Sequence, residues 1–334
     1  MKPNENSNSA KLINNVKDIG VTLSVPTRNT TKTDYKYSSR WSLKSVDTMK
    51  YSRDKARESR TNPELKGIIE KQVVSIANTG ATHIAIGTPY DEEFLSVMEF
   101  WVKEARRNNL KVFFRGNFSG WEKWNGYAKI DRETHIQKTK NFIEKNPGLF
   151  QDGDLFSSCP ECENGEKLDR SNPIQINEYR TFLIKEYNVT KEAFKNINKQ
   201  VPSNYYSMNG DIAFLMMDRK TTAAFDGLVV IDHYVKDTAR LERDIKALAL
   251  KSGGKIVLGE FGAPIPGIHG SMDERVQKKW IEDALQKISG IPDLIGINYW
   301  VGTDGSTAIW KDNGVPKPAV EVLTRYYKAS NSSD

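Results

Sequence analysis

The sequence has few of the residues that build metal or thiol centres. Cysteine occurs twice in 334 residues and histidine four times, and the histidines are scattered along the chain. A structural zinc site needs about four ligands, so this supply and spacing predict no metal centre. No stretch approaches the roughly 18 apolar residues that span a bilayer, so no transmembrane helix is expected. No Gly-rich phosphate loop follows an apolar run, which argues against the dinucleotide-binding folds.

Charge of one sign is not concentrated in any segment. The chain has 49 Lys and Arg against 43 Asp and Glu, a net charge of +6, and the two signs are interleaved. A nucleic-acid-binding protein usually shows a basic run or stripe, so we expect no nucleic-acid partner. Hydrophobic residues make up 38% of the chain, which is enough to bury a core. Residues 1–15 are polar and lack the apolar centre of a signal peptide, which predicts a disordered lead-in.

Short apolar runs alternate with longer amphipathic runs after this lead-in. The short runs predict eight strands, namely Ile19–Val25, Thr82–Gly87, Leu110–Arg115, Asp154–Ser158, Asn204–Met208, Leu228–His233, Lys255–Glu260 and Leu294–Tyr299. Helical periodicity is clear in Pro63–Ala77, Glu93–Arg107 and Ser271–Ser289, where Ser271 and Glu274 would form a capping box. Eight strands alternating with helices predict a single-domain (β/α)8 TIM barrel over residues 16–330. A doubly wound open sheet is the alternative, but its usual Gly-rich loop is missing.

The two cysteines form a Cys159-Pro160-Glu161-Cys162 sequence. This spacing can belong to a redox pair or to half of a zinc site. Here it follows a predicted strand and enters a loop, and no second pair exists in the sequence. We therefore expect a reduced or locally bridged pair that shapes the loop. A thiol-dependent protein is the alternative, and it would lose activity in a Cys162→Ser variant.

Acidic residues follow two of the predicted strands. In a barrel the reactive groups lie at the carboxyl ends of the strands. Glu260 ends the seventh run, and period-two alternation places it on the same face as Ile256 and Leu258. Glu161 and Glu163 come just after the fourth run, across the barrel mouth. A retaining glycosidase needs such a pair, one carboxylic acid and one carboxylate, about 5–5.5 Å apart.

With these residues in place, the sequence resembles clan A of the retaining glycoside hydrolases, which includes the family 5 cellulases and mannanases. The segments that carry the resemblance are Leu258-Gly259-Glu260-Phe261-Gly262, Asp232-His233-Tyr234, Asn298-Tyr299-Trp300 and the tail from Ile309 to Ala319. The resemblance implies that Glu260 is the nucleophile, that Tyr234 contacts it, and that Trp300 forms the floor for the cleaved sugar.

The fourth strand departs from the pattern of the clan, which has Asn-Glu there. This chain has Pro160 before Glu161, so the Asn that normally holds the sugar's 2-hydroxyl is absent at that position. Asn164 could substitute, which would make Glu163 the acid, and strand alternation does not separate the two glutamates. We favour Glu161, which is nearest the strand end and aligns with the motif's Glu. A weakened or inactive sugar-binding barrel remains the alternative function.

Aromatic and polar side chains near the strand ends complete the expected sugar site. The predicted substrate-binding residues are Arg53, Asn117, Trp121, Trp124, Asn164, His233, Tyr234, Tyr299 and Trp300. Arg53 could pair with the nucleophile, and Trp121 and Trp124 are expected on an exposed loop at outer subsites. We expect a monomeric enzyme that cleaves a β-linked glucan or mannan-like substrate without metal or cofactor. An extracellular or cell-surface location is favoured only because sugar-cleaving enzymes are often exported.

Overall fold

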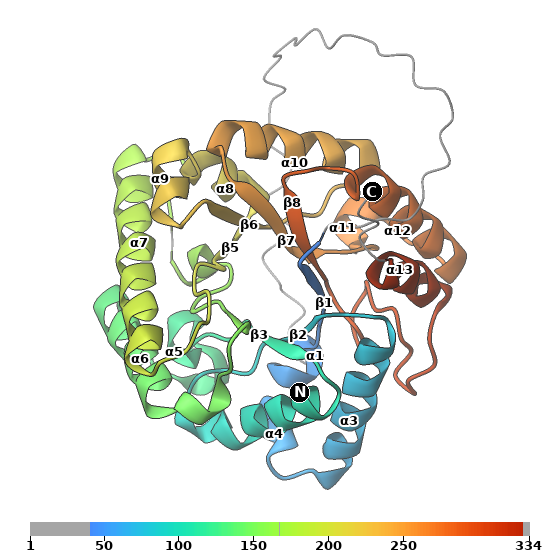
Figure 1. Cartoon of the computed structure of the whole chain (residues 1–334), viewed down its shortest axis with the longest axis horizontal. Helices are drawn as coiled ribbons and strands as arrows, with labels where there is room; N and C mark the ends of the chain where they lie inside the picture. Colours follow the sequence, from blue (N-terminus) through green and yellow to red (C-terminus); the bar gives the residue numbers. More distant parts are fainter. Residues whose placement is uncertain (1–40, 167, 330–334) are drawn as a thin grey trace, which may run out of the picture.

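The computed structural model describes residues 41–166 and 168–329, and within them eight parallel strands form one sheet. The strands are β1 (Leu43–Asp47), β2 (His83–Ile86), β3 (Lys111–Phe114), β4 (Leu155–Phe156), β5 (Ser207–Asn209), β6 (Leu228–Asp232), β7 (Lys255–Phe261) and β8 (Leu294–Tyr299). Their order in the sheet is β4-β3-β2-β1-β8-β7-β6-β5. Figure 1 shows the strands at the centre with the long helices around them, the arrangement of a (β/α)8 barrel.

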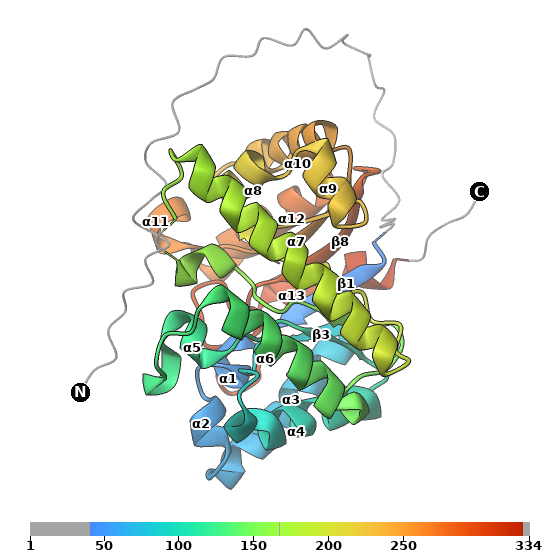
Figure 2. The same cartoon turned by 90° about the vertical axis from the view of Figure 1, so that its left-hand side faces the viewer.

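Helices connect consecutive strands and cover the outside of the sheet. They are α1 (Met49–Ser52), α2 (Ala56–Ser59), α3 (Pro63–Asn78), α4 (Leu95–Arg107), α5 (Ser119–Glu122), α6 (Arg132–Lys145), α7 (Pro173–Asn196), α8 (Gly210–Met216), α9 (Arg219–Ala224), α10 (Thr238–Ser252), α11 (Pro266–His269), α12 (Glu274–Ile288) and α13 (Pro318–Lys328). Two long helices start with proline after an asparagine cap: Asn62 accepts from Glu64 N, and Asn172 accepts from Ile174 N. Figure 2 shows α6 and α7 side by side on the outside of the barrel.

The seam between β4 and β5 is closed without a regular ladder. Phe156 N–H donates to Pro202 O at 2.9 Å, and Glu161 N–H donates to Ser207 O at 2.8 Å. These bonds run from the β4 side to the β5 side and complete the ring of strands. The seam lies beside the loop that carries Glu161, so the closure of the barrel also fixes the start of that loop.

Two apolar clusters form the core, one inside the barrel and one in its outer layer. The inner cluster contains Leu43, Ala85, Phe113, Leu155, Tyr205, Leu228, Val230 and Val257, drawn from strands all around the ring. The outer cluster is larger and lies between the sheet and the helices; it includes Ile256 and Leu258. Alternate residues of each strand therefore face opposite layers, as a pleated sheet requires.

The first strand of the barrel differs from the sequence prediction. It is Leu43–Asp47, a segment in which Lys44 and Ser45 interrupt the apolar run and hide the strand signal. The predicted strand Ile19–Val25 and the predicted lead-in lie outside the described residues. The other predicted strands match β2 to β8, although β5 begins three residues later than expected.

The predicted capping box of the helix before β8 is wrong. Helix α12 begins at Glu274, and its N-cap is Asp273, whose side chain accepts from Val276 N. Asp273 is itself a strong N-cap residue and stands directly before the first helical turn. Within the described residues, no helix is long and apolar enough to cross a membrane.

Candidate active site

Glu260 lies at the carboxyl end of β7, at the mouth of the barrel. The register of β7 shifts between Leu258 and Phe261, and Glu260 stands opposite Asp232 of β6. The simple alternation expected from the sequence is wrong here, because Leu258 faces the outer layer whereas Val257 faces the barrel interior. The irregularity changes the alternation and lets Glu260 join the polar groups at the strand ends.

Arg115, just after β3, holds the Glu260 carboxylate on one side. Its two terminal nitrogens donate to Glu260 Oε1 at 3.2 and 3.1 Å. The same guanidinium donates to Asp47 Oδ2 and, at 3.2 Å, to Asp232 Oδ2. One fully buried cation therefore faces three carboxylates. Burial alone would lower the pKa of Arg115, but the three negative charges outweigh it and raise the pKa.

Tyr234 holds the other oxygen of Glu260. Its hydroxyl donates to Glu260 Oε2 at 2.8 Å. Burial raises the pKa of Glu260, while Arg115 and the Tyr234 hydrogen bond act in the opposite direction by favouring the charged form. The two oxygens are thus oriented by different donors, which fixes the plane of the carboxylate.

Glu161 meets Glu260 across the mouth. Carboxylate oxygens of Glu161, Asp232 and Glu260 all lie within 4.8 Å of one another. Burial, together with the negative charges of Glu260 and Asp232, raises the pKa of Glu161 well above its usual range. The side chain of Asn164 donates to Glu161 Oε2 at 2.8 Å. In this pair Glu161 favours its protonated form, whereas the carboxylate of Glu260 is bound to the guanidinium of Arg115.

The carboxylate of Glu163 is hydrogen-bonded to other partners. Its Oε1 accepts from Asn209 N at 2.7 Å and from Asn209 Nδ2 at 3.0 Å. Its Oε2 accepts from the Tyr179 hydroxyl at 3.2 Å, and only 5% of the residue is exposed. Glu163 thus ties the loop after β4 to β5 and α7, and Asn164 serves Glu161 instead.

Asp232 adds a third carboxyl that the clan-like motif did not lead us to expect. It is 3% exposed, and burial together with the Glu260 charge raises its pKa well above the usual range. Among the described residues, Glu161, Asp232 and Glu260 form the one group with a spacing that could hold a metal ion. Arg115 already provides the positive charge beside two of them.

Several predicted substrate-binding residues line the same mouth. Tyr234 bonds to Glu260, Trp300 packs edge-on against Tyr234 with ring centroids 6.1 Å apart, and Asn164 contacts Glu161. The indole nitrogen of Trp300 has no hydrogen-bond partner among the described residues. His233, which was also predicted to bind substrate, follows Asp232 at the end of β6. Its Nε2 lies 2.9 Å from Asp244 Oδ2 of α10.

Arg53 and Trp124 lie together rather than on the nucleophile. The Arg53 guanidinium stands 4.7 Å from the centroid of the Trp124 ring. Its Nε donates to Asp54 Oδ1 at 2.8 Å, so Arg53 is not the hydrogen-bonded partner of Glu260 that the sequence led us to expect. Arg115 occupies that place because its strand points it inward.

Three other predicted substrate-binding residues are buried. Trp121 is 1% exposed and Asn117 and Tyr299 are 0% exposed. Trp121 was expected on an exposed loop, but its ring stacks on Phe182 and its Nε1 bonds to Cys162 O. The Tyr299 hydroxyl donates to Thr307 O at 2.7 Å. The polar atoms of the three side chains bond to backbone and side-chain partners, and the exposed position expected for Trp121 is wrong.

Sequence reasoning considered Arg115 only as the ion-pair partner of a structural Glu260, not as part of a catalytic site, and it overlooked Asp47. Both continue the inward alternation of their strands, from Phe113 to Arg115 and from Leu43 to Asp47. A charged residue at an inward position of a strand end is the signal that could have found them.

A cavity of about 600 Å³ adjoins the acid. Its lining includes Trp121, Glu122, Lys129, Arg132 and Asn164. Asn164 belongs both to this wall and to the Glu161 contact, so the cavity continues the mouth on the acid side. Burial raises the pKa of Glu122 to about 7. The lining is mainly polar and charged, which suits a hydroxylated ligand.

No family model and no curated protein matches the sequence. Solved structures do match its fold. A GH5_18 variant from Bifidobacterium longum, in complex with Manβ1-4GlcNAc, is 15% identical with a TM-score of 0.60, over 87% of this chain and 79% of that one. A GH5_18 from Streptomyces cattleya with GlcNAc is 9% identical, TM-score 0.64, over 88% and 82%. The β-D-glucuronidase of Dictyoglomus thermophilum is 16% identical, TM-score 0.53, over 78% and 47%.

Proposed function

We propose that the protein is a retaining glycoside hydrolase that cleaves a β-linked oligosaccharide or polysaccharide. The observation that carries the proposal is the approach of Glu161 and Glu260, whose carboxylate oxygens come within 4.8 Å at the ends of β4 and β7. Retaining enzymes need the two carboxyl groups about 5–5.5 Å apart, whereas inverting enzymes need room for a water between them. The fold shared with glycoside hydrolases is consistent with this chemistry.

In the first step Glu260 acts as the nucleophile. One of its oxygens attacks the anomeric carbon while the bond from that carbon to the glycosidic oxygen breaks. Glu161 transfers its proton to the departing oxygen, and the sugar becomes an ester of Glu260. Arg115 and Tyr234 keep Glu260 oriented and favour its ionised form before the attack.

In the second step Glu161 acts as a base. It takes a proton from water as the water oxygen attacks the anomeric carbon, and the ester bond to Glu260 breaks. Two inversions restore the original configuration. The raised pKa of Glu161 suits both roles, because it holds a proton until the leaving oxygen needs it.

The surroundings support a β-linked glucan or mannan-like substrate. Trp300 offers an aromatic face next to Tyr234 for the sugar that is cleaved. The cavity beside Glu161 provides space for the sugar on the leaving side. The GH5_18 structures hold Manβ1-4GlcNAc and GlcNAc, so β-mannosides and N-acetylglucosamine-linked sugars are the first substrates to test.

A substrate panel followed by NMR tests the proposal. Aryl β-glycosides and β-linked disaccharides should be hydrolysed, and the first product seen by proton NMR should be the β-anomer. A 2-deoxy-2-fluoro glycoside with a good leaving group should label Glu260, which peptide mass spectrometry locates. An α-anomeric first product, or a label on a different residue, would contradict the mechanism.

The second candidate is a sugar-binding barrel with weak or no turnover. Pro160 precedes Glu161 where the clan has Asn, so the usual contact to the 2-hydroxyl has no counterpart at that position. Calorimetry with the same sugars separates the candidates. Binding without hydrolysis across the panel would favour this alternative over the enzyme.

A further inference from the structure

The loop after β4 carries a disulfide whose two cysteines flank Glu161. Cys159 and Cys162 are bonded to each other, and their Cα atoms lie 5.0 Å apart. Both cysteines are buried, whereas Glu161 between them is partly exposed. The bridge therefore closes a small ring of backbone, and the Glu161 side chain leaves this ring toward Glu260.

The backbone inside the ring adopts a conformation that needs support. Glu161 has φ 45° and ψ 46°, in the left-handed region. For a residue with a side chain this conformation is unfavourable, because its Cβ comes too close to the following carbonyl oxygen. Apart from the bridge, the Glu161 N–H holds this turn by donating to Ser207 O at 2.8 Å. The covalent ring and the bond to β5 together favour the conformation that aims the carboxyl across the mouth.

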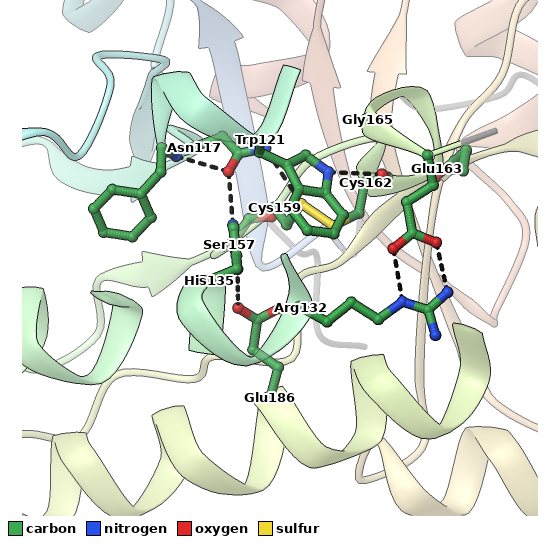
Figure 3. The surroundings of a disulfide bond; sticks show 12 residues. Asn117, Trp121, Arg132, His135, Ser157, Cys159, Cys162, Glu163, Gly165 and Glu186 are labelled. Atoms are coloured by element: carbon green, nitrogen blue, oxygen red, sulfur yellow. Dashed lines mark hydrogen bonds and ion pairs between the residues drawn. A yellow bond between two sulfur atoms is a disulfide. The ribbon is translucent and has the colours of Figure 1, made fainter. Parts of the chain in front are cut away.

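A buried chain of hydrogen bonds supports the bridge from behind. Asn117 Nδ2 donates to Cys159 Sγ at 3.2 Å. Asn117 Oδ1 accepts from Phe118 N at 2.7 Å, which fixes the orientation of the amide. His135 Nε2, 2.8 Å from the same oxygen, is therefore a donor, and its Nδ1 contacts Glu186. Figure 3 shows the line Glu186, His135, Asn117 and Cys159 leading to the disulfide.

The polar chain has no part in the proposed reaction, yet it is fully buried. Asn117, His135 and Glu186 are each 0% exposed. Polar and charged groups in the interior are costly, and an apolar cluster of the same volume is often at least as stable. This chain connects α6 and α7 with the end of β3 and with the bridge. Because the chain lies directly behind the loop of Glu161, it is placed to hold that loop in position.

Trp121 holds the bridge from the other side. Its Nε1 donates to Cys162 O at 2.8 Å, and its ring stacks on Phe182 with centroids 5.5 Å apart. Gly165 lies against the indole so closely that a Cβ there would stand 2.3 Å from Trp121 Cδ1. Both ends of the ring are thus fixed, Cys159 by an amide and Cys162 by an indole.

We propose that the Cys159–Cys162 disulfide, with Asn117 and the His135–Glu186 pair behind it, positions Glu161 as the general acid. This inference rests on the function proposed above. None of these residues touches the reacting atoms, so they are positioning residues. Loss of the bridge should release the turn at Glu161 and weaken proton donation, while Glu260 keeps its partners Arg115 and Tyr234.

Leaving-group dependence separates this role from a general loss of structure. The value of kcat/KM reports the step in which the glycosidic bond first breaks. In that step a dinitrophenyl leaving group departs without a proton, whereas a sugar leaving group must receive one. In the Cys159→Ser/Cys162→Ser variant we expect kcat/KM for a disaccharide to fall about 10- to 100-fold, part of the full value of general acid catalysis. For the dinitrophenyl glycoside of the same sugar, it should change less than about 3-fold, because that bond cleavage needs no general acid.

A second variant and a control keep the test decisive if the double variant folds poorly. Asn117→Ala leaves the bridge intact but removes its hydrogen bond. It should also lower kcat/KM for the disaccharide more than for the dinitrophenyl glycoside, by a smaller factor than the double variant. Gln72→Ala is the control, because Gln72 is also a buried amide, bonded at 2.9 Å to the Thr303 side chain, which lies outside the Glu161 loop. The control should change both substrates in parallel. A parallel change in the first two variants as well would overturn the inference.

Crystal structures of the wild type and the double variant give an answer that does not depend on turnover. The inference expects the Glu161 carboxyl to leave its place within 4.8 Å of Glu260 when the bridge is absent. An unchanged carboxyl would overturn it. If the wild type hydrolyses nothing, the proposed function fails, and the two structures still decide whether the bridge positions Glu161.

Discussion

At the scale of single residues, Glu161 and Glu163 show how surroundings separate two similar side chains. Glu161 meets Glu260 across the barrel mouth and takes one bond from Asn164. Glu163 receives three bonds, two from Asn209 and one from Tyr179. Burial raises the pKa of both groups, but the donors to Glu163 act in the opposite direction, whereas the carboxylates that face Glu161 raise its pKa further. The environment of Glu161 suits an acid catalyst, and that of Glu163 suits a structural anchor.

Substituting these two glutamates separately tests that difference. Glu161→Gln should lower kcat/KM for a disaccharide about 10²- to 10⁴-fold, the usual value of general acid catalysis. Glu163→Gln should change kcat/KM less than about 3-fold but destabilise the protein by about 1–2 kcal/mol, because the amide cannot accept all three bonds. Steady-state kinetics and urea unfolding measure the two effects. The reverse pattern would make Glu163 the acid.

Replacing the nucleophile should have a different result. Glu260→Gln should abolish hydrolysis of every glycoside, including those with activated leaving groups, because the attacking oxygen is lost. Circular dichroism and the melting temperature should show a folded protein. Retained hydrolysis by this variant would remove Glu260 from the mechanism.

The raised pKa of Glu161 also predicts how stability depends on pH. In the unfolded chain a Glu has a pKa of about 4.3, and burial with the nearby carboxylates raises it in the folded protein. Between the two values the folded state binds a proton that the unfolded state lacks. The stabilisation is therefore complete below about pH 4.3 and is lost as the pH rises through the folded-state pKa.

Glu161→Gln removes this loss, because the amide does not ionise. We expect its melting temperature to exceed that of the wild type by a few degrees near neutral pH, and by little at a pH close to the unfolded-state value of about 4.3. Calorimetry at the two pH values measures the difference. An equal shift at both values would mean that the charge of Glu161 costs no stability.

At the scale of elements, the two proposed catalytic groups rest on very different strands. Glu260 belongs to β7, which has seven residues and is paired on both sides. Glu161 follows β4, which has two residues and pairs in a ladder only with β3 among the described strands. The bond from Phe156 to Pro202 and the bond from Glu161 to Ser207 close the other side. The acid side therefore has less support from the sheet.

Hydrogen exchange should show this difference. Amides of β4 and β5 should exchange faster than those of β7, because a short strand with few ladder bonds opens at lower free energy. Mass spectrometry of peptides from the native protein measures the rates. Equal protection of β4 and β7 would contradict this view of the seam.

At the scale of the whole molecule, the alternation of apolar and amphipathic runs was sufficient to predict the barrel. It failed at β1, where Lys44 and Ser45 break the apolar run although the strand is central in the sheet. The acidic residues at the strand ends led to Glu161 and Glu260. The choice of Arg115 rather than Arg53 as the partner of Glu260, and the burial of Trp121, depend on contacts between distant segments, which local patterns do not record.

We expect the protein to be a monomer on the basis of its described surface. Its exposed large apolar side chains are Val74, Ile174, Leu215, Leu250, Val276 and Val315. Each belongs to a different helix or loop, so none of these elements offers a run of exposed apolar residues for a second copy. Light scattering after gel filtration should give the mass of one chain at all concentrations. A mass that doubles with concentration would contradict this expectation.

The bridge around Glu161 has a consequence for how the protein is produced. Both cysteines of the chain take part in it, so a polypeptide made in a reducing cytoplasm starts with two thiols and must be oxidised afterwards. Batches from different expression hosts could then share one sequence and one fold but differ in specific activity. Measuring the intact mass of each batch detects the two extra hydrogens of the thiol form and so shows whether the bridge has formed.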